Sequence, residues 1–134
     1  MPITYQKVNI SSEDDIYFAL STVRHFMKQL PFSEADQQKI FVSVSELTRN
    51  ILDHAFSKGI ICCELLEQGI RLVVTDEGPG ILDVEDVING KRRSSSRGLG
   101  LGLSGVKRLM DEFHIETSRR GTRIVAIKWA TKQP

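Results

Sequence analysis

The fold of this chain is decided by the stretch Gly98-Leu99-Gly100-Leu101-Gly102-Leu103-Ser104-Gly105. Four glycines fall within these eight residues, and an apolar run with helical spacing over 106–113 follows directly. Glycine has no Cβ, so the backbone at these positions can approach a ligand closely. A helix that begins here directs its unpaired N–H groups and the positive end of its dipole toward the loop. The stretch therefore predicts an anion site, most often one for phosphate, with a tight loop-to-helix junction as the alternative.

Two familiar glycine motifs match this stretch in their glycine spacing but not in the residues around it. The dinucleotide-binding pattern matches Gly100 to Gly105, but it needs a strand directly before it, and the basic segment 92–97 stands there instead. The P-loop has the same glycine spacing, but Val106 occupies the place of its lysine. The further motifs of an ordinary protein-kinase fold are absent from the sequence.

Length and composition predict one ordinary globular domain over 1–134, with 40% hydrophobic and 26% charged residues. A net charge of +1 gives no global field that favours nucleic acid. No apolar run is long enough to predict a membrane span, and the first residues lack the apolar core of a signal peptide. We therefore expect a cytoplasmic protein that binds neither nucleic acid nor membrane. Cys62 and Cys63 are adjacent, so in a strand they would face opposite sides, and we expect reduced packing residues.

Apolar spacing divides the chain into helices and strands. The predicted strands cover 2–10, 60–66, 70–75, 114–118 and 122–130, and the predicted helices run from Ser11 or Ser12 to Pro31, from Ser33 to about Ser57-Lys58-Gly59, over 83–89 and over 106–113. The basic segment 90–97 has no periodicity, which predicts a mobile segment. Because the elements lack regular β-α-β alternation, the sequence predicts an α+β fold. We expect a two-layer sandwich in which helices cover one face of a mixed, mostly antiparallel sheet.

Two further stretches carry polar residues at informative spacing. In the second predicted helix, Glu46 and Asn50 stand at i and i+4 and so share one face. An amide oxygen can ligate a hard cation, and a carboxylate can take a proton from a hydroxyl, but a surface Glu and Asn are the plainer alternative. The second stretch, Asp76-Glu77-Gly78-Pro79-Gly80, ends an apolar strand. Its carboxylate would be partly buried and would seek hydrogen-bond donors, unless this is an ordinary strand-ending turn.

Taken together and in this order, these stretches resemble the motifs of the GHKL (Bergerat-fold) ATP-binding family. That family has E-x-x-x-N on a helix, D-x-G-x-G after a strand, a lid, G-x-G-x-G at a helix start and Gly-Thr in the last hairpin. The corresponding residues here are Glu46 to Asn50, Asp76 to Gly80, Gly98 to Gly102 and Gly121-Thr122. The resemblance implies the Bergerat fold, with ATP and Mg²⁺ as cofactors.

The resemblance also implies a role for each motif residue. Glu46 is implied as the general base, Asn50 as the magnesium ligand and Asp76 as the acceptor of the adenine amino group. Thr122 is implied to support the same edge of the base through water. Nucleotide contacts are implied for Gly78, Gly80, Gly98, Gly100, Leu101, Gly102 and Leu103. Arg97 either meets the γ-phosphate or is a solvated charge of the lid, since this basic lid departs from the family pattern.

Within the family, the chain resembles the RsbT-type switch kinases of bacterial stressosomes, which are small anti-sigma-type serine/threonine kinases. The resemblance is carried by the segments 45–51, 105–113 and Ala126-Ile127-Lys128-Trp129. It implies an enzyme that phosphorylates a STAS-domain antagonist protein, with a PP2C-type phosphatase as a second partner and a large stressosome scaffold as a further candidate. An anti-sigma factor that sequesters a sigma factor is the alternative, because both classes share the nucleotide site.

Overall fold

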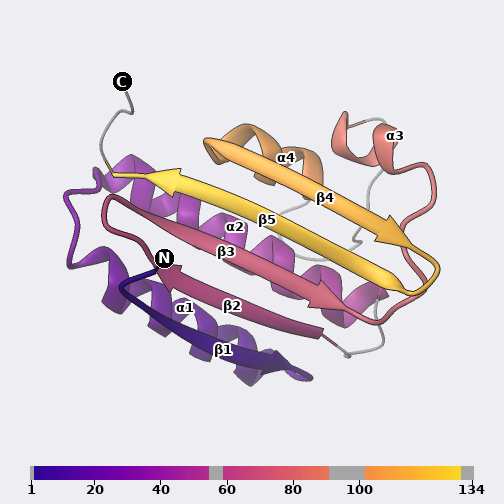
Figure 1. The fold of residues 1–134 in the computed structure, drawn as a ribbon, viewed down its shortest axis with the longest axis horizontal. Coiled ribbons are helices and arrows are strands. Elements are labelled where there is room, and N and C mark those ends of the chain that lie inside the picture. The colour runs from indigo at the N-terminus through magenta and orange to yellow at the C-terminus, as the bar shows by residue number, and fades with distance from the viewer. Residues whose placement is uncertain (1, 55–58, 91–101, 131–134) are drawn as a thin grey trace.

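Five strands form one sheet in the order β1-β2-β3-β5-β4, and each pairing in it is antiparallel (Figure 1). This computed structural model describes residues 2–54, 59–90 and 102–130. The strands are β1 (Thr4–Ile10), β2 (Gly59–Leu65), β3 (Gly69–Asp76), β4 (Glu112–Ser118) and β5 (Gly121–Trp129). Strands β2 and β3, and likewise β4 and β5, follow one another in the chain, so short turns connect them as hairpins.

The helices among the described residues are α1 (Glu13–Met27), α2 (Glu34–His54), α3 (Val84–Ile88) and α4 (Gly102–Leu109). In Figure 1, α1 and α2 run behind the sheet and cover one of its faces. Helix α1 begins where Asp15 Oδ2 accepts the backbone N–H groups of Ser11 at 2.8 Å and Ser12 at 3.1 Å. These bonds, that of Ser11 first, hold the pKa of the Asp15 carboxyl below its usual value.

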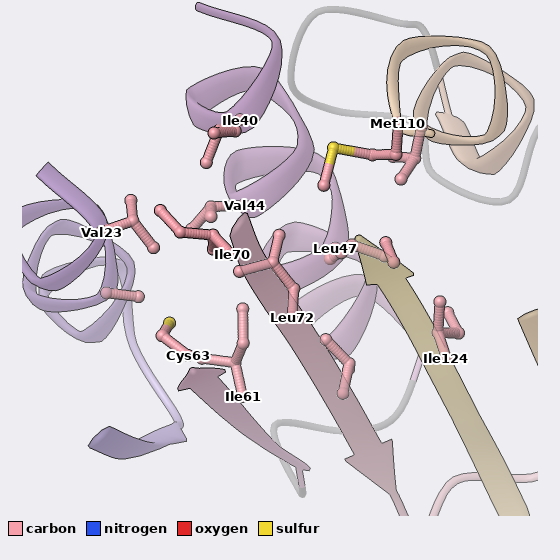
Figure 2. Packing of buried hydrophobic residues seen from close by; sticks show 14 of the residues in the cluster. Val23, Ile40, Val44, Leu47, Ile61, Cys63, Ile70, Leu72, Met110 and Ile124 are labelled. Atoms are coloured by element: carbon pink, nitrogen blue, oxygen red, sulfur yellow. The ribbon is translucent and has the colours of Figure 1, made fainter. Parts of the chain in front are cut away.

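The hydrophobic core fills the layer between these helices and the sheet. Figure 2 shows its side chains converging from α1, α2, β2, β3 and β5, together with Met110, which follows α4. In β2, Ile61, Cys63 and Leu65 are buried because alternate side chains of a strand point to the same face. Cys62 lies half-buried on the opposite face, as its sequence position predicts. Burial raises the pKa of the Cys63 thiol to about 12, so this cysteine stays protonated.

The predicted α+β sandwich is confirmed, although every pairing in the described sheet is antiparallel and no parallel pair occurs in it. The helix predicted over 106–113 is wrong in its bounds, because α4 begins at Gly102 and ends at Leu109. Residues 112–118 form β4 instead, since pairing with β5 overrides the local helical spacing. The first helix ends at Met27 rather than at Pro31. The predicted lid, 90–97, lies outside the described residues from position 91 onward.

Candidate functional site

A column of buried polar side chains runs along the helix α2. Ser43, Glu46 and Asn50 are spaced three and then four residues apart, so they share one face of the helix. Their exposed fractions are 0%, 2% and 4%. The surface alternative for the Glu46–Asn50 pair is therefore wrong. Fully buried ionisable side chains are uncommon in proteins, so a buried glutamate one turn from a buried asparagine is an informative arrangement.

Asn50 carries a buried oxygen whose partner is missing from the described part of the chain. Its Oδ1 is fully buried and has no hydrogen-bond partner among those residues, and the same is true of Ser43 Oγ. Burying such an oxygen without a partner destabilises the fold by about 1–3 kcal/mol. A cation that accepts an amide oxygen as ligand would remove that cost. Sequence reasoning overlooked Ser43, although its spacing from Glu46 on an otherwise apolar stripe was available as a signal.

Asp76 lies at the last position of β3, where the strand passes into the glycine-containing turn. Its Oδ1 accepts the backbone N–H of Gly78 at 2.9 Å, which holds the carboxylate over the turn. The register of the sheet places Asp76 opposite Thr122 of β5. Thr122 is 6% exposed, and its Oγ1 lies 2.8 Å from Oγ1 of Thr117 in β4. The carboxylate and the two hydroxyls therefore gather at one end of the sheet.

Two glycines allow the backbone to close around this end of the sheet. Gly80 has a φ of +87°, and a Cβ there would lie 2.2 Å from the carbonyl oxygen of Ser118. Gly121 has a φ of +143°, and a Cβ there would lie 2.0 Å from the carbonyl oxygen of Asp76. Any other residue at these positions would clash with backbone and adopt a conformation that L side chains rarely take. This explains the glycine of Gly121-Thr122 in physical terms.

The surface is hollowed on both sides of Asp76. A concave region of about 490 Å³ is lined by residues of the β1, β2 and β3 ends, among them Ser11, Gly59 and Asp76. A second region of about 380 Å³ is lined by Asp76, Thr117 and Thr122 together with the β4–β5 turn. Asp76 lines both regions and is half-buried, so this residue borders surface that a ligand can reach.

The glycine stretch supplies the start of α4. Gly102 and Leu103 are both buried, and α4 packs against both α2 and α3. Helix α4 is thereby held against the helix that carries Glu46 and Asn50. Four further predicted site residues, Arg97, Gly98, Gly100 and Leu101, lie outside the described residues.

Lys128, in the segment Ala126-Ile127-Lys128-Trp129, has a structural role that the sequence did not reveal. Its side chain is 8% exposed, and Nζ donates to the carbonyl oxygen of Leu109 at 3.0 Å and to Oδ1 of Asp111 at 3.2 Å. The same Nζ lies 3.6 Å from Oδ1 of Asp36 in the first turn of α2. One buried ammonium thus joins the end of α4 to the beginning of α2.

Arg49, three residues after Glu46 on α2, forms a structural ion pair. Its NH1 and NH2 groups donate to the two carboxylate oxygens of Glu13 at 2.7 and 2.9 Å. This bidentate contact links α2 to the first turn of α1. Paired geometry of this kind is the strongest form of an arginine–carboxylate interaction.

Comparison with known protein families gives the class to which this site belongs. The family model of the histidine kinase-like ATPase domain matches residues 12–128. The chain belongs to the histidine kinase-like ATPase family, which confirms the resemblance drawn from the three motifs.

Relatives within this family narrow the class. The chain is 43% identical over 127 residues to the serine/threonine-protein kinase RsbT of Bacillus subtilis, a match that covers 91% of this chain and 94% of that protein. It is 31% identical over 127 residues to the anti-sigma F factor of Clostridium novyi, covering 89% of each. The predicted enzyme class, a serine/threonine-protein kinase, is confirmed by the first of these relatives.

Solved structures agree on the fold. The RsbU and RsbW domains of Rv1364c from Mycobacterium tuberculosis superpose with a TM-score of 0.68 at 14% identity, over 98% of this chain and 34% of that one. The catalytic domain of the histidine kinase ThkA gives a TM-score of 0.59 at 16% identity, over 97% of this chain and all of that one. Within the described residues, none of the helices has the length and apolar character that a membrane crossing requires.

Proposed function

We propose that this protein transfers the γ-phosphoryl group of ATP to a serine or threonine of a STAS-domain antagonist protein in a bacterial partner-switching pathway. Family membership supports the use of ATP, and the similarity to RsbT supports the partner class. The observation that carries the proposal is the buried Glu46–Asn50 pair on α2 beside the helix that begins in the glycine stretch. In this proposal the protein works in the cytoplasm, with a PP2C-type phosphatase and a stressosome scaffold as further partners.

The residues present fit a magnesium ion. Asn50 Oδ1 is a buried amide oxygen without a partner in the described chain, and amide oxygens are among the ligands that hard cations accept. Mg²⁺ usually binds through one or two protein oxygens together with substrate phosphates, so a single protein ligand is sufficient. Bound there, Mg²⁺ would neutralise phosphate charge.

We assign recognition of the base to the end of the sheet where Asp76 and Thr122 lie. Asp76 keeps Oδ2 for a ligand while Oδ1 accepts the Gly78 N–H, and a carboxylate oxygen suits the amino group of adenine. Thr122 contributes a hydroxyl beside it. Backbone N–H groups at the start of α4, including those of Gly102 and Leu103, are proposed to bind phosphate, because helix N-termini attract anions.

Glu46 is proposed to accept the proton of the attacking hydroxyl. The serine or threonine oxygen forms a bond to the γ-phosphorus, the bond from that phosphorus to the β,γ-bridging oxygen breaks, and ADP leaves. The hydroxyl proton passes to the Glu46 carboxylate. Phosphoryl transfer depends mainly on positioning and charge neutralisation, so this small set of groups is sufficient.

The alternative, an anti-sigma factor that sequesters a sigma factor, is favoured by the similarity to the anti-sigma F factor of Clostridium novyi. Both classes would use the same nucleotide site. Copurification separates them: we expect a STAS-domain protein to be retained and phosphorylated, whereas stable retention of a sigma factor would support the alternative.

Transfer from labelled ATP tests the proposal directly. With Mg²⁺ and a STAS-domain protein, Glu46→Ala should bind ADP as the wild type does but lose transfer by about 100-fold or more. Asp76→Asn should lose nucleotide binding itself. Glu67→Ala, in the exposed β2–β3 turn, is the control and should change neither. Transfer by Glu46→Ala at the wild-type rate would show that the base is assigned wrongly.

A further inference from the structure

A row of three polar side chains crosses the end of the sheet. The register pairs Asp76 of β3 with Thr122 of β5, and Thr122 with Thr117 of β4. Figure 1 shows these three strands side by side with the paired ends at the same end of the sheet. Paired residues point to one face, here the face of the buried Val74 and Ile124. The proposed nucleotide site uses Asp76 and Thr122 but gives Thr117 no role.

Thr117 has two hydrogen-bond partners, which together fix the position of its hydroxyl. The backbone N–H of Ile81 donates to Thr117 Oγ1 at 2.9 Å. An amide N–H can only donate, so Thr117 accepts in that contact. The other partner is Thr122 Oγ1 at 2.8 Å, and either hydroxyl can be the donor there, because a hydroxyl oxygen can accept two hydrogen bonds.

The direction of this bond decides what Thr122 presents to a ligand. When Thr117 is the donor, the proton of Thr122 remains to be donated outward. Beside it, Asp76 offers the acceptor Oδ2, since Oδ1 already accepts the Gly78 N–H. With Thr117 as the donor, the site formed by Asp76 and Thr122 therefore presents a hydrogen-bond acceptor next to a hydrogen-bond donor. Adenine presents the complementary order, a donor at its amino group and an acceptor at N1, whereas guanine presents the reverse.

We infer that Thr117 donates to Thr122 and is thereby a positioning residue for base recognition, which fixes Thr122 as a hydrogen-bond donor toward N1 of adenine. Thr117 acts through Thr122 and through Ile81, and it does not touch the base itself. The polarity is the same when one water bridges Thr122 to N1, because a water that accepts from Thr122 donates onward. The inference rests on the proposed nucleotide site and deepens it by adding a determinant of base specificity.

Measuring the affinity of two protein variants for two nucleotides tests this role of Thr117. Titration calorimetry in Mg²⁺ measures the Kd of ATP and of 1-deaza-ATP, which has C–H in place of N1, for the wild type and for Thr117→Val. The wild type should bind 1-deaza-ATP about fivefold more weakly than ATP, the effect of one hydrogen bond. Thr117→Val should bind ATP more weakly, and its discrimination between the two nucleotides should fall to about twofold or less.

Two further variants sharpen the test. Thr117→Ser keeps the hydroxyl and should restore the wild-type discrimination. Thr117→Ala removes the hydroxyl without added bulk and should behave as Thr117→Val does, so the test stands even where the valine variant fails to fold. Thermal unfolding of each apo variant verifies that it is folded.

The outcomes separate this inference from the proposed function. If Thr117→Val and Thr117→Ala still discriminate between ATP and 1-deaza-ATP as the wild type does, Thr117 is only a structural residue, whatever the change in overall affinity. Equal binding of ATP and 1-deaza-ATP by the wild type would show that Thr122 does not donate to N1. Absence of ATP binding by the wild type would instead overturn the nucleotide site itself, and this inference with it.

Discussion

The Nζ of Lys128 lies 3.0 Å from the carbonyl oxygen of Leu109, at the end of the helix that begins in the glycine stretch. Carbonyls at a helix C-terminus lack partners within the helix and carry the negative end of its dipole, so a buried ammonium there satisfies both. Because the same Nζ approaches Asp36 of α2, this contact sets the two helices of the site relative to each other.

Removing the Lys128 ammonium should therefore destabilise the protein. Lys128→Met keeps most of the stem and leaves Leu109 O and Asp111 Oδ1 without the lysine donor, so unfolding in urea should show a loss of about 1–3 kcal/mol. The binding of ATP should weaken as well. Lys107→Met, at an exposed position of α4, is the matched control and should leave the midpoint unchanged. An unchanged midpoint for Lys128→Met would show that Lys128 does not join the two helices.

Asn50 combines a cost to stability with a proposed function. Asn50→Leu replaces the partnerless buried oxygen by an apolar group of similar size, so the apo protein should gain about 1 kcal/mol while the binding of Mg²⁺-ATP is lost. Differential scanning calorimetry and nucleotide titration measure the two effects. Asn89→Leu, at an exposed position, should give neither. A destabilised apo variant would contradict this account of the Asn50 oxygen.

Gly121 should tolerate no side chain. Gly121→Ala combines a positive φ with a Cβ placed 2.0 Å from the carbonyl oxygen of Asp76, so the hairpin must shift. We expect a loss of about 3 kcal/mol in unfolding free energy, together with weaker ATP binding. Gly90→Ala separates the two causes, because Gly90 also has a positive φ but, among the described residues, its Cβ would meet only Ser104, at 3.5 Å. Equal losses in the two variants would mean that backbone strain alone accounts for the effect.

The free energy of unfolding should fall at alkaline pH because the thiol of Cys63 is buried. Its pKa is raised from 9.0 to about 12 in the folded chain, so only the unfolded chain ionises readily between these values. The stability from the neutral buried thiol is complete below pH 9 and is lost as the pH rises toward 12. The slope of unfolding free energy against pH should therefore be steeper in the wild type than in Cys63→Ala, by at most about 1.4 kcal/mol per unit. Identical slopes would contradict a buried, protonated thiol.

Much of this architecture could be predicted because local patterns and packing agree. The continuous apolar run 60–66 and the β-branched residues of 70–75 located the β2–β3 hairpin, and helical spacing located α1 and α2. The start of α4 was missed because glycine disfavours helix by intrinsic propensity, yet Gly102 and Gly105 lie buried within this helix, which packs against α2. Its end was missed because the strand that follows is fixed by pairing with β5, which the local sequence does not encode.

The candidate site likewise contains some residues that could be predicted from the sequence and others that could not. Motif residues such as Glu46, Asn50 and Asp76 could be proposed from their spacing together with the family resemblance, and burial of the first two removed the surface alternative. Thr117 and Lys128 could not be identified, because an isolated threonine or lysine in a strand reads as a solvent-facing residue. Their importance comes from the register of β4 and β5 and from contacts between elements far apart in the chain.

The polar row of Asp76, Thr122 and Thr117 and the Glu46–Asn50 pair occupy different elements, the row at the strand ends and the pair on α2. On the proposed roles, losing the Glu46 carboxylate alone would leave nucleotide recognition intact. A single-codon change would then give a protein that binds nucleotide without transferring phosphate. Catalysis and nucleotide binding would thus be separable traits, and selection or protein engineering could adjust either one while the other is kept.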